Sequence, residues 1–506
     1  MNLFSLICVI FIVNNVDCSN ILAIFKMPSK SHTILGVKLA EGLIKRGHHV
    51  TLASPYNVEP MENYTHIHLK TLQEYKDRMS KSMLGPQMNQ IQKFMRVMKF
   101  MKELNDLFWE ESEIQKIIKE KPKYDLIITG SLNDDAIYAL PHHLGVPIII
   151  FSGIGTNILV NKYLANPNMV YTVDKPNTFL GRLYSVTTNA LTSVATDMIM
   201  DPHEQDILNK YFPNAPPLQD LKKNASLMLL NSHFSIESPR PYIPNMIQIG
   251  GFHLQDGKEL PKDFKSYLDS AEDGAILFSL GSNVLISNID ESKLKGIFKV
   301  LGEMAPMKVI FKSELEHDNI PKNIMVRKWL PQAEILGHPN TKIFISHGGL
   351  GGITESVYHG VSILGIPFFG DQQANLADAV SSGYALVVTY QELNEEIFRT
   401  KLKELKDNSK YLQNAKKRSA LMKGQPVKPM DNAVFWIEHV IKFGGCDHLR
   451  NAGMEMSWYQ LYMVDIYVFY TVLLGLIFIV NYYILKFLLK LLKRVLYVRN
   501  AKVKSQ

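Results

Sequence analysis

The stretch that says most about the fold is residues 329–373, which read WLPQAEILGHPNTKIFISHGGLGGITESVYHGVSILGIPFFGDQQ. Its segments 343–346 and 362–367 are apolar runs, which are typical of buried parallel strands. Between them, the residues SHGG at 346–349 form a strand-to-helix turn with little side-chain bulk. Backbone N–H groups in such a turn can approach a phosphate at the helix N-terminus. The stretch therefore predicts a nucleotide-binding α/β domain.

The polar and aromatic side chains of this stretch suit the other parts of a nucleotide linked to a sugar. Trp329 follows a strand and offers a flat face on which a base can stack, and Gln332 can bond the edge of that base. Glu355 lies two turns into the following helix and suits ribose hydroxyls. Asp371 and Gln372 follow the next strand, and a carboxylate beside an amide can bind adjacent sugar hydroxyls.

The rest of the body extends the same pattern into two tandem domains. Apolar strands are predicted on both sides of a proline-rich segment, and helical stretches, among them 31–46 and 134–144, lie between most of them. The predicted strands are 21–25, 49–54, 125–129 and 146–151 before that segment, and 275–280, 308–312 and 324–328 after it. Two such βαβ-rich domains create a cleft at the carboxyl ends of their strands.

Three further segments of the body have distinct compositions. Residues 72–120 read as amphipathic helix, and residues 157–212, rich in Met and Tyr, read as irregular chain that forms either plain core or the lining of an apolar pocket. Three prolines within residues 238–244 exclude a helix or a central strand there. We expect an interdomain linker at this point.

The 329–373 stretch resembles the donor-binding motif of the UDP-glycosyltransferase family in order and spacing. The resemblance extends along nearly the whole chain. It includes His32 after the first strand, the sequence FSLGS at 278–282, the approach to the C-terminal apolar segment, that segment and the basic tail. The layout is similar to that of the membrane-bound animal enzymes, and in detail to the insect members.

The resemblance implies two Rossmann-like domains in the GT-B arrangement, with the acceptor in the first and the UDP-sugar in the second. It also implies roles for individual residues. Trp329 would stack on uracil, and Gln332 would bond the edge of that base. The diphosphate would contact Ser282 and His347 beside the turn glycines Gly348 and Gly349, and the ribose would bind to Glu355. The sugar would bind to Asp371 and Gln372, and His32 would be the general base.

These implied roles are chemically consistent. A hydroxyl is a poor nucleophile, and an imidazole can accept its proton as it attacks. UDP leaves from the opposite face of the anomeric carbon, so the configuration inverts from α to β. The leaving charge falls on the diphosphate, near His347 and a helix N-terminus. The chain contains no Asp-x-Asp motif, and we expect no bound metal and no permanent cofactor.

The sequence departs from the family pattern at two positions. Family members usually place an acid just after the strand 125–129 to orient the catalytic histidine, but this chain has Gly130-Ser131. The nearest acids are Asp134 and Asp135, of which Asp135 is slightly favoured as the partner of His32. Many relatives also carry Asn where this chain has Gly351, although insect relatives often lack it.

Charge along the chain is concentrated at its C-terminal end. Lys and Arg total 55 and Asp and Glu total 48 in 506 residues, and seven of the cations, with no acid, lie in residues 486–506. Residues 1–485 therefore carry no net charge, so the excess of basic residues does not indicate nucleic-acid binding.

Residues 466–485 are apolar and long enough to span a bilayer. The positive-inside rule then predicts a cytosolic tail and a lumenal body.

The N-terminus predicts entry into the secretory pathway. Residues 1–18 contain an apolar run too short to span a membrane, followed by small residues typical of signal-peptide cleavage near Cys18; the alternative is a first buried strand. Cleavage would leave Cys446 as the sole thiol. Asn63 and Asn224 are candidate glycosylation acceptors. The C-terminal KVKSQ resembles a lysine-based retrieval signal, so we expect a single-pass protein of the endoplasmic reticulum membrane.

The sequence thus predicts a complete domain plan. It comprises a signal peptide (1–18), an acceptor domain (19–240), a linker (241–250), a UDP-sugar domain (251–445), a juxtamembrane segment (446–465), a transmembrane helix (466–485) and a basic tail (486–506). The acceptor would be a small lipophilic molecule with a hydroxyl, recognised by the regions 60–120 and 157–230. The expected donor is UDP-glucose, with UDP-glucuronate as the alternative, and self-association in the membrane is expected from the family.

Two other classes of protein are alternatives to a transferase. A non-catalytic protein that binds the UDP-sugar without turnover is the alternative that Gly130 suggests. A dinucleotide oxidoreductase would need Gly-x-Gly-x-x-Gly after the first strand, and residues 26–36 contain no such motif.

Overall fold

The computed structural model describes residues 18–83, 89–130, 134–156, 158–167, 178–255, 259–282 and 284–504. The predicted signal peptide except Cys18, together with Ser131 and Asn283, lies outside the described residues. The chain divides between Arg450 and Asn451 into two compact units, of which the first holds both sheets and the second holds the C-terminal helix.

The first sheet is entirely parallel and, among the described residues, has seven strands. Their spatial order is β3 (Tyr64–His68), β2 (His49–Ser54), β1 (Asn20–Ile24), β4 (Leu126–Thr129), β5 (Ile148–Ser152), β6 (Ala225–Leu230) and β7 (Met246–Gln248). Both faces are covered, which explains the continuous apolar runs. Along β1, Leu22 and Ile24 enter the core on one face, while Ile21 and Ala23 enter the core on the other.

The second sheet is also parallel, with six strands among the described residues. Their order is β10 (Ile324–Arg327), β9 (Lys308–Lys312), β8 (Ala275–Ser279), β11 (Thr341–Ser346), β12 (Ser362–Gly365) and β13 (Ala385–Val387). Ile276 and Phe278 of β8 pack into the core on one face, and Leu277 packs into the core on the other. Two doubly covered parallel sheets confirm the predicted pair of Rossmann-like domains.

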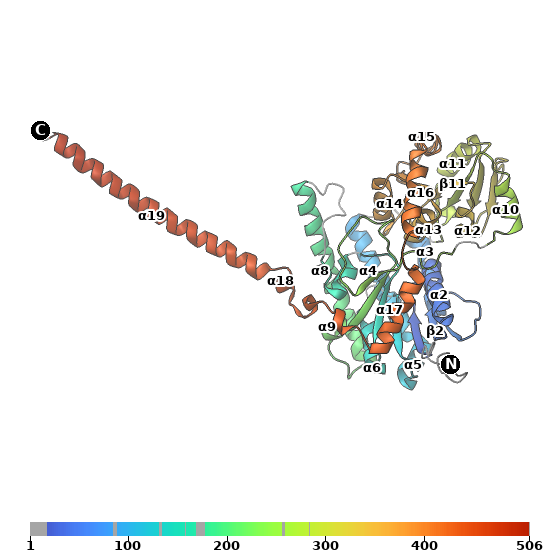
Figure 1. Ribbon diagram of the computed structural model, residues 1–506, viewed down its shortest axis with the longest axis horizontal. Helices are drawn as coiled ribbons and strands as arrows, with labels where there is room; N and C mark the ends of the chain where they lie inside the picture. Colours follow the sequence, from blue (N-terminus) through green and yellow to red (C-terminus); the bar gives the residue numbers. More distant parts are fainter. Residues whose placement is uncertain are drawn as a thin grey trace, which may run out of the picture. The chain divides into compact units, whose positions relative to one another are not determined.

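Helices connect most of the strands and cover both faces of each sheet (Figure 1). In the first half they are α2 (Lys30–Ile44), α3 (Lys70–Met83), α4 (Gln90–Glu110), α5 (Ser112–Glu120), α6 (Ala139–Leu144), α7 (Ile158–Asn161), α8 (Phe179–Tyr211) and α9 (Leu218–Leu221). In the second half they are α10 (Lys262–Asp269), α11 (Glu291–Glu303), α12 (Gln332–Leu336), α13 (Leu350–His359), α14 (Gln372–Ser381), α15 (Glu395–Asp407), α16 (Lys410–Lys423) and α17 (Pro429–Phe443). A short 3₁₀ turn, η1 (Asp135–Tyr138), precedes α6.

Two elements differ from the predicted domain boundaries. Strand β7 pairs with β6 of the first sheet, although residues 241–250 were predicted to be a linker. Helix α17 follows the second sheet in sequence but packs against α2 and β6 (Figure 1). Its residues Ala433, Val434 and Ile437 are buried in the core of the first sheet. The apolar face of α17 therefore ties the end of the second half to the first.

Residues 157–212 were predicted to be irregular, and that prediction is wrong for much of the segment. Helix α8 runs for 33 residues and contains Pro202 in its interior. A proline normally breaks or kinks a helix. Here the turns on both sides of Pro202 are held by buried or half-buried contacts of Asp201 and Glu204 with other elements. Tertiary contacts thus override the local sequence signal.

The second unit consists mainly of α18 (Trp458–Leu461) and the long helix α19 (Val464–Lys504). Within the described part of the chain, residues 464–494 form one helix long and apolar enough to cross a membrane, and its most apolar 18-residue window has a mean hydropathy of 2.2. This stretch contains the predicted span 466–485. The apolar helix is compatible with membrane anchoring.

Candidate active site

The carboxyl ends of the strands in both sheets open onto one large cleft. Its cavity volume is about 3160 Å³, and residues of both halves line it. Nine of the twelve site residues predicted from the sequence are among them, namely His32, Ser282, Trp329, Gln332, His347, Gly349, Glu355, Asp371 and Gln372. The three that do not line the cleft are Gly348, Asp134 and Asp135.

The glycine-rich turn after β11 surrounds the imidazole of His347. A Cβ atom on Gly281 or on Gly349 would lie 2.6 Å from the nearest atom of that ring. Gly348 has a φ of 85°, and a Cβ there would lie 2.5 Å from Leu376. Gly348 thus lets the turn pack closely against Leu376, on the side away from the cleft. These three positions need glycine, because a side chain would displace the ring or open the turn.

The imidazole of His347 is held neutral and retains an unused ring nitrogen. Burial, with a smaller effect from the charge of Lys312, lowers the pKa of His347 to about 4. Its Nδ1 atom is buried and has no hydrogen-bond partner among the described residues. A buried polar atom without a partner is costly unless a ligand or water satisfies it. The position at the start of α13 suits an anionic ligand.

A second group of side chains lies along α12 and α13. The Nε2 atom of Gln332 donates a hydrogen bond to Oε2 of Glu355 at 2.6 Å. Burial raises the pKa of Glu355 to about 7, and the bond from Gln332 opposes this rise. The indole of Trp329 lies nearby in sequence and is 53% exposed within the cleft wall. An exposed indole beside a buried acid and an amide is an arrangement suited to a nucleoside.

Asp371 and Gln372 lie at the start of α14, where the loop after β12 ends. The Oε1 atom of Gln372 accepts hydrogen bonds from the backbone N–H groups of Phe368 and Phe369, at 2.8 and 3.1 Å. The carboxylate of Asp371 accepts a hydrogen bond from Asn375 at 2.6 Å. Burial raises the pKa of Asp371. Both side chains are therefore fixed in position at the cleft.

His32 faces the cleft from the first turn of α2. A Cβ atom on Gly153 would lie 3.1 Å from Cε1 of His32, so the ring packs against the loop after β5. Burial lowers the pKa of His32 to about 4. The ring is consequently neutral near pH 7 and able to accept a proton.

The structure contradicts the predicted hydrogen bond between His32 and Asp134 or Asp135. Asp134 forms a buried ion pair with Lys26. Asp135 accepts a hydrogen bond from Tyr163 at 2.6 Å and pairs with Lys222 at 2.7 Å. Neither carboxylate bonds His32 within the described part of the chain.

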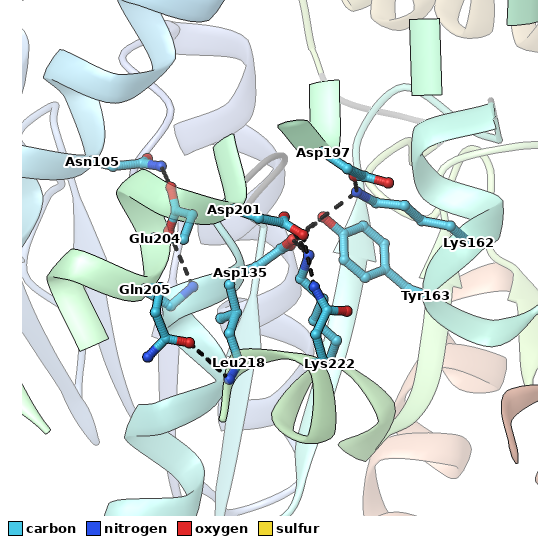
Figure 2. A network of polar contacts seen from close by, with 12 residues as sticks. Asn105, Asp135, Lys162, Tyr163, Asp197, Asp201, Glu204, Gln205, Leu218 and Lys222 are labelled. Carbon is cyan, nitrogen blue, oxygen red and sulfur yellow. Dashed lines mark hydrogen bonds and ion pairs between the residues drawn. The ribbon is translucent and has the colours of Figure 1, made fainter. Parts of the chain in front are cut away.

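Asp135 instead belongs to a buried polar network in the first half of the chain (Figure 2). Burial alone would raise the pKa of Asp135, but Lys162 and Lys222 outweigh it and hold that pKa below its usual value. Lys222 in turn pairs with Asp201 of α8 at 2.6 Å. On the same helix, Glu204 accepts a hydrogen bond from Asn105 at 2.5 Å. The network joins η1, α4, α8 and the chain around α9.

Phe25 fills the space beside Gly130, the position where family members usually carry the orienting acid. A Cβ atom on Gly130 would lie 3.0 Å from Cδ1 of Phe25, and one on Gly36 would lie 2.8 Å from Cγ of the same ring. Phe25 is 1% exposed. The ring and the two glycines therefore form one packed unit, and an acid at position 130 would need this ring to move.

Two cleft residues were not found from the sequence. Lys30 and Lys312 both line the cleft, and the Nζ atoms lie 3.7 and 4.8 Å from the centroid of the Trp329 ring. Lys312 could have been found from its position at the carboxyl end of a predicted parallel strand. No local sequence pattern identifies Lys30 as a cleft residue. Its contact with Trp329 forms only in the folded protein, because the two residues are about 300 positions apart in the sequence. Among the described residues, no cluster of His, Cys, Asp or Glu could hold a metal ion.

The two sheets and the shared cleft define the GT-B fold. The solved structure of the spinosyn forosaminyltransferase SpnP has this fold, with a TM-score of 0.56, 16% identity and coverage of 84% of this chain and 99% of that one. The family model described as UDP-glucoronosyl and UDP-glucosyl transferase matches residues 23–502. The chain belongs to the UDP-glycosyltransferase family.

Relatives within the family come from insects and mammals. The UDP-glycosyltransferase UGT5 of Dactylopius coccus is 30% identical over 503 residues, which cover 96% of this chain and 95% of that protein. The UDP-glucuronosyltransferase 2A3 of Pongo abelii is 39% identical over 244 residues, which cover 48% and 46% of the two chains. The named relatives therefore include both insect glycosyltransferases and mammalian glucuronosyltransferases.

Proposed function

We propose that this protein is an inverting, membrane-anchored transferase that moves a hexose from a UDP-sugar to a hydroxyl of a small lipophilic acceptor. The observation that carries the proposal is the shared cleft. It brings the neutral imidazole of His32 from one half to the same cavity as Trp329, His347 and Glu355 from the other. A base on one side and a site for a nucleoside and an anion on the other are what direct displacement requires.

In this reaction each residue of the donor site binds one part of the UDP-sugar. Uracil stacks on Trp329, Gln332 bonds the edge of the base, and the ribose hydroxyls donate to Glu355. The diphosphate lies against Ser282, His347 and the turn at Gly348 and Gly349, where the start of α13 and the ring nitrogen can donate to it. Asp371 and Gln372 bind hydroxyls of the sugar.

The transfer step needs one base and one stabilised leaving group. The acceptor oxygen attacks the anomeric carbon, the bond from that carbon to the diphosphate oxygen breaks, and the acceptor proton passes to His32. UDP carries the electron pair away, and the donors around His347 stabilise its new charge. Attack occurs opposite to UDP, so an α-linked donor yields a β-linked product.

The lipophilic acceptor is supported by the part of the cleft that α4 and α8 line. This wall is mainly apolar and includes Phe94, Val97, Met98 and Leu191. It lies within the two regions predicted to recognise the acceptor. UDP-glucose is the preferred donor because Asp371, close to the expected sugar, would repel the carboxylate of UDP-glucuronate unless a cation compensates.

The apolar helix α19 and the basic tail support our proposal for anchoring and topology. We place its apolar part, residues 466–485, across the endoplasmic reticulum membrane with the basic tail in the cytosol and the catalytic body in the lumen. Lipophilic acceptors concentrate in the same membrane.

The test is a transfer assay in microsomes that contain the full chain. UDP-glucose and UDP-glucuronate are each supplied with a panel of phenols and other lipophilic alcohols, and conjugates are identified by mass. We expect hexose conjugates from UDP-glucose. Conjugates from UDP-glucuronate alone would reverse the donor assignment, and saturable UDP binding without any conjugate would favour a non-catalytic protein. The contacts that keep Asp134 and Asp135 away from His32 are the observation that favours this second candidate.

Replacement of the stacking indole is expected to weaken nucleotide binding. Trp329→Ala removes one base–aromatic stack, which contributes about 1–3 kcal/mol, so the Kd for UDP should rise roughly 5- to 150-fold. Isothermal titration of the full chain with UDP measures this change. Trp458→Ala, which removes an indole from the second unit, serves as the control and should leave the Kd unchanged. An unaltered Kd in Trp329→Ala would show that the base binds elsewhere.

The affinity for uridine is expected to rise with pH because of Glu355. The pKa of Glu355 is raised to about 7 without nucleotide, so the acid is largely protonated at pH 6 and ionised at pH 8. Only the carboxylate can accept hydrogen bonds from both ribose hydroxyls, so a proton must leave on binding below pH 7. Uridine avoids the phosphate of UDP, which titrates near pH ~6.

The measurement is the Kd for uridine at several pH values. We expect affinity to fall by up to about tenfold per unit below pH 7 and to level off above it. Glu355→Gln should abolish this dependence. A pH dependence that persists in Glu355→Gln would mean that another group titrates on binding.

A further inference from the structure

Two lysines from different halves of the protein meet at one aromatic ring. Lys30 is the first residue of α2, and its Nζ atom lies 3.7 Å from the centroid of the Trp329 ring. Lys312 is the last residue of β9, and its Nζ atom lies 4.8 Å from the same centroid. Both contacts are cation–π interactions by distance. They place two positive charges beside the expected base site.

Neither ammonium group forms an ion pair with a carboxylate of the described residues. Within the described part of the chain, no ion pair joins Lys30 or Lys312 to an acid at 4.0 Å or less. Lys312 donates a hydrogen bond to the carbonyl oxygen of Gly281 at 2.8 Å. Burial and the charge of Lys30 lower the pKa of Lys312, while Glu314 and Glu355 oppose the shift. Two partly buried cations at the same ring repel each other, and an anion bound near both would offset this repulsion.

The position of Lys312 identifies where such an anion would bind. Its partner Gly281 lies beside the imidazole of His347, since a Cβ atom on Gly281 would be 2.6 Å from that ring, and the charge of Lys312 acts on the imidazole. Lys312 thus lies between the indole of Trp329 and the turn that suits phosphate. A ligand that carries both a base and an anionic group could occupy both places at once. A nucleoside diphosphate is such a ligand, with its base stacked on Trp329 and its two phosphates near Lys312.

Lys30 and a stacked base compete for the indole. At 3.7 Å from the centroid, the ammonium group of Lys30 is in contact with the ring that a base would need. Lysine has a long, flexible side chain with a mobile point charge, so it can leave the ring without movement of α2. The nearest group able to attract the displaced charge would be the diphosphate of the same nucleotide.

We propose that Lys30 is a diphosphate-binding residue contributed by the first half of the protein, which covers Trp329 before the nucleotide binds and moves to the phosphates afterwards. This proposal rests on the proposed function, since it assumes that the cleft binds a uridine diphosphate. It assigns to the half that carries His32 a direct contact with the donor. Donor binding would then hold the two halves together around the reacting groups.

The test compares UDP with uridine in three variants of the full chain. Lys30→Met keeps the length of the side chain and removes the charge, and Lys30→Arg keeps the charge. Lys45→Met makes the same charge change beyond the far end of α2, at an exposed position that does not line the cleft. Kd values are measured by isothermal titration, and thermal midpoints are compared to confirm that each variant is folded.

We expect opposite effects on the two ligands. Lys30→Met should weaken UDP binding about tenfold or more, because it removes a charge-assisted contact to phosphate. It should leave uridine binding unchanged or strengthen it by a few fold, because the base no longer displaces a cation from the ring. Lys30→Arg should restore most of the UDP affinity, and Lys45→Met should match the parent for both ligands.

Two results would overturn the proposal. Equal weakening of UDP and uridine in Lys30→Met would mean that Lys30 supports the base site and does not contact phosphate. Unchanged binding of both would mean that it contacts neither. A parent protein that binds neither UDP nor uridine would instead refute the proposed function itself, and this result is distinguishable because it needs no variant.

Discussion

His32→Ala is expected to lower the rate of sugar transfer by about 10²- to 10⁴-fold, the usual contribution of a general base. The Kd for UDP should remain that of the parent, because Trp329, Glu355 and His347 lie on the other half of the cleft. The loss should therefore appear in kcat and not in donor affinity. His142→Ala is the matched control, since His142 is exposed on α6 and does not line the cleft. Transfer that survives in His32→Ala would show that another group accepts the proton.

The pH dependence of kcat provides a second test of His32. Burial lowers its pKa to about 4, so the base is already neutral at pH 6 and stays so at higher pH. We expect kcat to be flat from pH 6 to 8 and to fall only as the pH approaches 4, where the imidazole gains a proton. Saturating UDP-sugar is needed so that the titration of Glu355 does not enter. A fall in kcat centred near pH 7, at saturating donor, would contradict a neutral, buried base.

Asp135→Ala is expected to destabilise the fold by about 3–5 kcal/mol, the usual effect of removing one partner from a buried ion pair. Asp135 is 2% exposed and pairs with Lys222 and Lys162, two half-buried lysines that would keep only Asp201 and Asp197 as acidic partners. Tyr163 would also lose its acceptor. The thermal midpoint of the detergent-solubilised protein measures the effect, and it should fall by several degrees.

The controls for Asp135 separate stability from catalysis. Asp220→Ala, at an exposed position on α9, should leave the thermal midpoint unchanged. Asp135→Asn keeps a hydrogen-bond acceptor for Tyr163, so its thermal midpoint should lie between those of the parent and of Asp135→Ala. At temperatures where the variants remain folded, kcat should equal that of the parent. A normal thermal midpoint combined with lost transfer would support the role predicted from the sequence, in which Asp135 orients His32.

The central strands of both sheets were predictable because each is a short apolar run buried on both faces, whereas β3, β6, β7 and β13 were not predicted, and the burial pattern of β3 is mixed. The residues at 275–279 and 341–346 show this pattern plainly. Helix α8 was not predictable, because Pro202 and a weak apolar periodicity hide a helix that contacts from distant segments hold in place. The packing of α17 against the first sheet was also not predictable, because an apolar helix face does not indicate which of two sheets it covers.

Some parts of the candidate site were likewise predictable from the sequence, and others were not. Residues of the donor site lie close together in sequence, on the turns that follow successive strands, so their spacing alone brings them to one edge of the sheet. The partners of Asp135 come from residues 162, 163 and 222, and no local pattern links them. The contact of Lys30 with Trp329 likewise depends on how the two halves face each other. Local motifs therefore predicted the donor side well and the surroundings of the base poorly.

The configuration of the product tests whether His32 and the diphosphate site act from opposite sides of the anomeric carbon. The conjugate formed from an α-linked UDP-sugar would be isolated, and the coupling of its anomeric proton would be measured by NMR spectroscopy. We expect a β-linked product, because the acceptor attacks from the side of His32 while UDP leaves toward His347. An α-linked product would contradict direct displacement across the cleft.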